Sequence, residues 1–208
     1  MQLITRRVID DVIRQVACWQ QQGLRFRASM NVSTRDLYSG DIVSHLSARL
    51  AEHRVPAGQI QLEVTESALL ADPNRVLATM THLSTLGVDI SLDDFGTGYS
   101  SLQHLRKLPL TEIKIDRSFV GGMARNSDDA AIVRSTVELA RALGLRAVAE
   151  GVEDAYTWQL LAEAGCTLAQ GWYTARPMPA DQVPLWLAER TRSRELAAVK
   201  LTADAALS

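Results

Sequence analysis

The sequence predicts an α/β protein built as a parallel (β/α) barrel, on two observations. Short apolar runs alternate with longer amphipathic stretches, and strands separated by helices must pair in parallel. Each apolar run also ends on a polar or charged residue, and the strand ends of a parallel barrel all open on one face. A doubly wound open sheet is the competing arrangement, but it would spread those residues along a line.

Six apolar runs are expected to form the strands. In the second run, Ile60, Leu62 and Val64 alternate with polar residues, so they are expected to share one side of the strand. The expected strands are residues 24–32, 59–65, 88–92, 112–115, 146–149 and 168–170.

The stretches between the strands have helical periodicity and helix-terminating residues. Thr5 is expected to cap the first helix, Asp72 a helix with Pro73 in its first turn, and Asp154 a later helix. The expected helices cover residues 5–23, 41–54, 72–86, a short segment after residue 101, and residues 118–123, 128–144, 154–165 and 179–195. One domain is therefore expected over residues 1–195, followed by a frayed Ala-rich tail at 196–208.

Composition excludes several classes of protein. The formal charge of −2 gives no basic field for a nucleic acid polymer. Cys18 and Cys166 form no CxxC pair, which is typical of a reducing compartment. There is no apolar run of about 20 residues for a membrane helix and no signal peptide at the start. A cytoplasmic protein is expected.

The polar residues at the strand ends are rich in oxygen. They are Asn31, Glu63 with Glu66, Asp93 with Asp94, Lys114, Glu150 and Gln170. Clustered carboxylates need a compensating cation, and hard oxygen ligands favour Mg²⁺ or Mn²⁺, with room for two ions about 4 Å apart. No His or Cys lies at a strand end, which argues against zinc. The ammonium of Lys114 could orient a metal-bound water or neutralise phosphate charge.

Each of these residues also has an ordinary structural interpretation. Glu66 and Asp94 could cap the helices that follow them, Asn31 could form an Asx turn, and Lys114 could be a surface lysine. It is much less expected that all six strands end on such residues by coincidence than that these residues form a shared site. The glycine loop at 95–101 could be a plain connection, but its position beside two acids favours a gating loop.

These residues, in this order, resemble the EAL domain family. The segments that carry the resemblance are NVS at 31–33, LEVTE at 62–66, DDFGTGYSSL at 93–102, IKIDRSFV at 113–120, AEGVE at 149–153 and AQG at 169–171. The match covers residues 3–190, and the ten-residue loop segment is its most specific part.

The resemblance implies a TIM-like barrel that hydrolyses cyclic di-GMP to linear pGpG. It implies Mg²⁺ or Mn²⁺, two ions, held by Asn31, Glu63, Asp93 and Asp94, with Glu150 as a further ligand or the water-positioning base. Lys114 would contact the metal-bound water, and Gln170 would position water or a neighbouring group. Glu66 would anchor the loop at 94–101, which is expected to contribute to a homodimer contact. A sensor or GGDEF domain is an expected partner.

The sequence also departs from the family pattern. The Glu-Ala-Leu tripeptide that names the family does not occur upstream of the first helix, so an incomplete barrel with about six of eight strands is expected. Thr167 and Trp172 replace a common Asp and a common Tyr or Phe. Low turnover is therefore expected. The alternatives are an impaired domain that acts as a cyclic di-GMP receptor or protein-interaction module, a start codon placed too late, and an enzyme for another phosphodiester.

Overall fold

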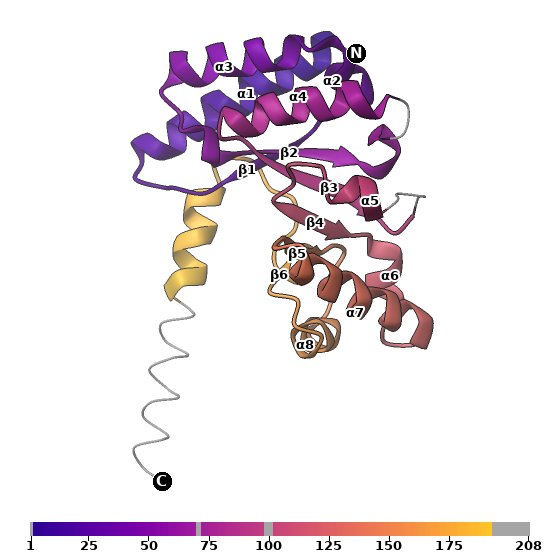
Figure 1. Cartoon of the computed structure of the whole chain (residues 1–208). Coiled ribbons are helices and arrows are strands. Elements are labelled where there is room, and N and C mark those ends of the chain that lie inside the picture. The colour runs from indigo at the N-terminus through magenta and orange to yellow at the C-terminus, as the bar shows by residue number, and fades with distance from the viewer. Residues whose placement is uncertain (1, 70–71, 98–101, 193–208) are drawn as a thin grey trace.

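Six parallel strands form one curved sheet whose order follows the sequence, from β1 at one edge to β6 at the other (Figure 1). The computed structural model describes residues 2–69, 72–97 and 102–192. The strands are β1 (Ala28–Asn31), β2 (Ile60–Thr65), β3 (Asp89–Phe95), β4 (Glu112–Ile115), β5 (Arg146–Ala149) and β6 (Leu168–Ala169). Every pairing is parallel. The predicted α/β class and the incomplete, six-stranded barrel are confirmed.

Helices connect the strands and cover the outer face of the sheet. They are α1 (Gln2–Gln21), α2 (Thr34–Ser39), α3 (Asp41–His53), α4 (Pro73–Thr85), α5 (Leu102–Leu105), α6 (Arg117–Gly122), α7 (Ser127–Ala142) and α8 (Ala155–Glu163). Two short 3₁₀ helices, η1 (Ala57–Gln59) and η2 (Glu66–Leu69), flank β2, and residues 183–192 are helical. Helices α1 to α4 lie beside β1 to β3, and α6 to α8 lie beside β4 to β6 (Figure 1).

Two of the three predicted helix caps are confirmed. Asp72 accepts a hydrogen bond from the Arg75 amide, and Asp154 accepts one from the Thr157 amide. The prediction for Thr5 is wrong, because the described part of α1 already begins at Gln2. The Thr5 hydroxyl instead donates to Asp36 Oδ2 at 2.8 Å.

Several further elements differ from the prediction: β1 begins at Ala28 rather than at residue 24, β3 extends to Phe95 rather than ending at residue 92, the last helix is described from residue 183 rather than 179, and two other helices differ as well. Helix α2 was not predicted; its capping box, in which Ser33 and Asp36 bond each other's backbone amides, stabilises six residues that are too short for a periodic pattern. Helix α7 begins one residue early because Asn126 caps it. The predicted tail at 196–208 lies outside the described residues.

The two faces of the sheet differ in chemistry. Side chains of Ile60, Leu62 and Val64 are almost fully buried, as are the corresponding apolar residues of the neighbouring strands, and they pack in the hydrophobic core. Because successive strand residues point to opposite faces, the polar residues between them share the concave face. The interior of this half-barrel is therefore polar, and the apolar core lies between the sheet and the helices.

The chain after β6 returns toward the other edge of the sheet. The indole Nε1 of Trp19, on α1, donates to the carbonyl of Ala180 at 3.2 Å, and Trp19 also packs on Phe26. This contact ties the segment that follows β6 to the helix beside β1. Among the described residues, none of the helices combines the length and the apolarity that crossing a bilayer requires.

Candidate functional site

Lys114 lies at the centre of a cluster of carboxylates at the carboxyl ends of the middle strands. Its Nζ is 3.0 Å from Glu63 Oε2, 2.9 Å from Asp93 Oδ1 and 2.5 Å from Glu150 Oε1. The Lys114 side chain is only 4% exposed, and Glu63 and Asp93 are also buried. Residues that are far apart in the sequence thus form one ionic centre.

The sheet itself accounts for this convergence. Glu63 lies on β2, Asp93 on β3 and Lys114 on β4, and Glu150 follows the last residue of β5. All four strands run in the same direction, so their carboxyl ends meet at one mouth of the half-barrel.

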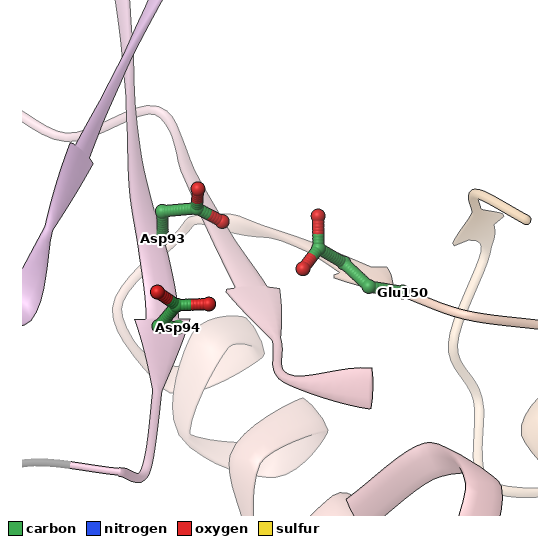
Figure 2. A group of neighbouring side chains, drawn as sticks. All are labelled: Asp93, Asp94 and Glu150. Carbon is green, nitrogen blue, oxygen red and sulfur yellow. The ribbon is translucent and has the colours of Figure 1, made fainter. Parts of the chain in front are cut away.

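A bulge in β3 brings two successive acids to the same site. In a regular strand Asp93 and Asp94 would point to opposite faces, but the pairing of β3 with β4 shifts register between Leu92 and Phe95. Asp94 has φ of +55°, in the left-handed region. As a result, ligand oxygens of Asp93, Asp94 and Glu150 lie within 4.8 Å of one another, and the three carboxylates gather at one place (Figure 2).

The electrostatics of the cluster favour a bound cation. Burial lowers the pKa of Lys114, but its hydrogen bonds to Glu150, Asp93 and Glu63 outweigh burial and raise that pKa above the ordinary value. Burial raises the pKa of Glu150, an effect that Lys114 only partly opposes, while Asp93 and Glu63 add to it. A single ammonium is therefore shared among more negative charge than it can neutralise.

Asp116 joins the site although sequence reasoning did not select it. Burial raises the pKa of Asp94, and the neighbouring charges of Asp93 and Asp116 raise it further, as does a hydrogen bond with the Asp116 side chain. Burial also opposes ionisation of Asp116, but hydrogen bonds from Ser118 and Asp94 lower its pKa overall. The alternation of Glu112, Lys114 and Asp116 in the sequence could have indicated Asp116 as a site residue, because residues two apart share one face of a strand.

The remaining predicted residues lie around this centre. Asn31 is the last residue of β1 and pairs in register with Glu63, and its side chain is exposed. Gln170 follows β6. Its backbone N–H donates to the Ala149 carbonyl at 2.8 Å, and its side chain is exposed. Glu66 is buried in η2, beside the end of β2.

The glycine loop is described only as far as Thr97. The Thr97 hydroxyl donates to the Asp94 carbonyl at 2.8 Å, which closes a tight turn. Gly96 has φ of +100°, and a Cβ there would lie 3.1 Å from the Phe119 ring. Glycine is therefore required at 96 by backbone conformation and by close approach. Residues 98–101, and with them half of the loop predicted to form the dimer contact, lie outside the described residues.

The donor set fits a hard divalent cation. Asp93, Asp94 and Glu150 offer carboxylate oxygens at mutual distances suited to a shared ion, and Glu63 contacts the same lysine as Asp93 and Glu150. Oxygen ligands of this kind match Mg²⁺ and Mn²⁺.

This chain is similar in sequence to known proteins. The sequence model of the EAL domain matches residues 1–177. The bifunctional diguanylate cyclase/cyclic di-GMP phosphodiesterase MucR of Pseudomonas aeruginosa is 42% identical over 177 residues, 85% of this chain and 26% of MucR. The cyclic di-GMP phosphodiesterase PdeR of Escherichia coli is 39% identical over 181 residues, 87% of this chain and 27% of PdeR. The chain thus spans about a quarter of the length of these relatives.

Solved structures share the fold. The MucR phosphodiesterase of P. aeruginosa in complex with c-di-GMP superposes with a TM-score of 0.84 at 41% identity, over 87% of this chain and 74% of that one. A manganese and c-di-GMP complex of Klebsiella pneumoniae BlrP1 superposes with a TM-score of 0.74 at 30% identity, over 83% of this chain and 45% of that one.

Proposed function

This chain belongs to the EAL domain family, and from that membership we propose that it hydrolyses cyclic di-GMP to linear pGpG in a metal-dependent reaction. The observation that carries the proposal is the cluster at the mouth of the half-barrel, where Lys114 contacts Glu63, Asp93 and Glu150. The names of the similar proteins support the substrate, since PdeR and MucR are cyclic di-GMP phosphodiesterases.

The residue roles follow from the chemistry of each side chain. Two Mg²⁺ or Mn²⁺ ions would be held by oxygens of Asn31, Glu63, Asp93 and Asp94. Glu150 would be a further ligand or the base. Gln170 is assigned to positioning water and Glu66 to anchoring the glycine loop. Asp116, whose carboxyl group interacts with that of Asp94, is assigned to orienting that ligand.

The reaction breaks one P–O3′ bond of the cyclic dinucleotide. Water attacks phosphorus, its oxygen stays on the 5′-phosphate, and the departing O3′ takes up a proton to become a hydroxyl. Divalent ions at this site would lower the pKa of the attacking water and neutralise charge on the phosphate. Glu150, a carboxylate beside Lys114 and Asp93 at the mouth of the half-barrel, is suited to accept the proton of the water. Lys114 holds positive charge beside the phosphate and orients the water.

A direct assay tests this function. Purified chain in excess over cyclic di-GMP, with Mn²⁺, is expected to yield pGpG, slowly as the sequence argument predicts, and EDTA is expected to stop the reaction. Lys114→Met is expected to lower the rate by about 100-fold or more, because it removes the cation that faces the transition state. Lys107→Met, a matched change at an exposed lysine, is expected to keep the wild-type rate.

Two results would contradict the proposal. If the wild-type chain with Mn²⁺ binds cyclic di-GMP but produces no pGpG on long incubation, the receptor function is the correct one. If it converts another phosphodiester and leaves cyclic di-GMP intact, the substrate is wrong.

The partners are proposed on the same basis. Because the chain spans about a quarter of MucR, whose name also includes diguanylate cyclase activity, a sensor or GGDEF domain is the partner we propose. A homodimer contact through the loop at 94–101 and a cytoplasmic location remain predictions.

A further inference from the structure

A second polar network lies on the concave face, beneath the carboxylate cluster. Gln61, Ser91 and Glu112 each lie two residues before Glu63, Asp93 and Lys114 on β2, β3 and β4. They therefore point to the same face as the cluster residues, about 7 Å further from the mouth. Nothing in the proposed chemistry uses this lower network.

Glu112 is the central acceptor of the network. The residue is 7% exposed, and its carboxylate accepts hydrogen bonds from Gln61 Nε2, from Ser91 Oγ at 3.2 Å and from Arg146 Nε at 3.2 Å. These donors come from β2, β3 and β5, so one side chain on β4 joins four strands.

The network continues outward through a second acid. Arg146 also donates to Asp89 Oδ2 at 3.3 Å, and Arg27, just before β1, donates to Asp89 and to Gln61 Oε1 at 3.1 Å. Hydrogen bonds thereby connect side chains on β2, β3, β4 and β5 with Arg27, which immediately precedes β1. Those strands are the ones that carry Asn31, Glu63, Asp93, Lys114 and Glu150 to the mouth.

Stability alone is a weak explanation for this network. Burying a carboxylate with its partners costs desolvation, and well-packed apolar residues in the same place are often equally stable. A site whose ligands come from several strands has a different requirement, because its geometry depends on how those strands sit relative to one another. Hydrogen bonds across all of them, one side-chain layer below the ligands, meet that requirement.

We propose that Glu112 is a positioning residue for the metal cluster: through Gln61, Ser91 and Arg146 it fixes the relative placement of Glu63, Asp93, Lys114 and Glu150. This inference rests on the proposed metal site, and Glu112 itself touches neither substrate nor ion. Residues that orient metal ligands typically change metal affinity 10- to 100-fold when they are replaced.

The test compares Glu112→Gln and Glu112→Leu in the full chain, with Mn²⁺ as the probe. The leucine variant replaces the charge by an apolar group of similar size, so it separates stability from positioning. Both variants are expected to bind Mn²⁺ about 10- to 100-fold more weakly than wild type when fully folded. The electron paramagnetic resonance spectrum of the remaining bound Mn²⁺ is expected to change, because the ligand geometry is altered.

Two matched variants serve as controls. Thr79→Val removes a buried hydrogen bond to the Leu37 carbonyl, remote from the cluster, and is expected to lower the unfolding midpoint without changing Mn²⁺ affinity or its spectrum. Glu138→Gln makes the same change as Glu112→Gln, but on an exposed face of α7. It is expected to change neither the unfolding midpoint nor the Mn²⁺ affinity.

The possible results distinguish this inference from the proposed function. Wild-type Mn²⁺ affinity and spectrum in Glu112→Leu would overturn the positioning role, even if the wild-type chain hydrolyses cyclic di-GMP. Weaker Mn²⁺ binding in both Glu112 variants would support it, even if cyclic di-GMP proved not to be the substrate. A wild-type chain that binds no Mn²⁺ would overturn both.

Discussion

At the scale of single residues, the cluster holds more negative charge than its one ammonium can balance. Lys114 pairs with three acids, while Asp94 and Asp116 add a second pair of interacting carboxyl groups beside them. Without a metal ion, ionising Glu150 costs more free energy in the folded protein than in the unfolded chain, chiefly because of burial, and its pKa is raised. A bound divalent cation would favour the ionised form of Glu150. The Glu150 carboxylate should therefore destabilise the metal-free protein and stabilise the metal-bound protein.

Glu150→Gln is the residue-scale test of this argument. Folding raises the pKa of the Glu150 carboxyl. The protein therefore loses stability as pH rises from 4.5, the pKa of this group in the unfolded chain, through its pKa in the folded protein. The metal-free variant is therefore expected to be at least as stable as wild type at pH 7, and to lose less stability between pH 4 and pH 7. Urea unfolding in EDTA measures this.

The same variant should behave differently with Mn²⁺. Because a ligand or its close neighbour is lost, the stabilisation that Mn²⁺ gives Glu150→Gln is expected to be smaller than for wild type. A metal-free variant that is clearly less stable than wild type at pH 7 would contradict the electrostatic argument.

At the scale of elements, two irregularities shape the site more than the regular strands do. The β3 bulge turns Asp94 toward Asp93, and the segment after β6 folds back on the residues after β5. In that segment the Val152 amide donates to the Gln170 carbonyl at 3.1 Å, and the Tyr173 amide donates to the Val152 carbonyl at 3.0 Å. These bonds hold Gln170 beside the residues that follow Glu150.

Gly171→Ala tests how closely the two segments must approach. A Cβ at 171 would lie 2.1 Å from the Val152 carbonyl oxygen, and backbone atoms cannot move aside as a side chain can. The free energy of unfolding is expected to fall by about 3 kcal/mol. Gly144→Ala, where φ is +72° but nothing lies within 4 Å, is expected to cost only about 1 kcal/mol. Equal losses in urea unfolding would show that close approach is not the cause.

At the scale of the whole molecule, the fold places its apolar core outside the sheet and its charges inside. Ligand candidates come from positions between 31 and 150, and only the curvature of the sheet brings them together. An unfolded chain has no such site. Metal binding should therefore contribute directly to the stability of the fold.

Mn²⁺ is expected to raise the unfolding midpoint of the chain. At a concentration about 100 times its dissociation constant, an ion that binds only the folded state adds about 2.7 kcal/mol. EDTA should reverse the effect, and Glu63→Gln should reduce it, whereas Glu138→Gln should not. Thermal unfolding measures each case. A shift of the same size in Glu63→Gln would show that the ion binds elsewhere.

The sequence by itself determined the class of fold, most element positions and the principal residues of the site. Local chemistry was sufficient for these: apolar alternation specifies which strand face is buried, and Asp72 and Asp154 cap their helices through bonds to residues three positions away. The charged ends of apolar runs predicted the residues that gather around Lys114.

Tertiary structure decided what depends on contacts between distant strands. The pairing of Asp116 with Asp94 and the network around Glu112 involve side chains brought together by strand register and curvature. A pattern in one strand shows which face a residue occupies, but its partner across the sheet is set by the neighbouring strand's alignment. For that reason Glu112 looked like an ordinary strand residue in the sequence, and only the folded sheet shows it joining four strands.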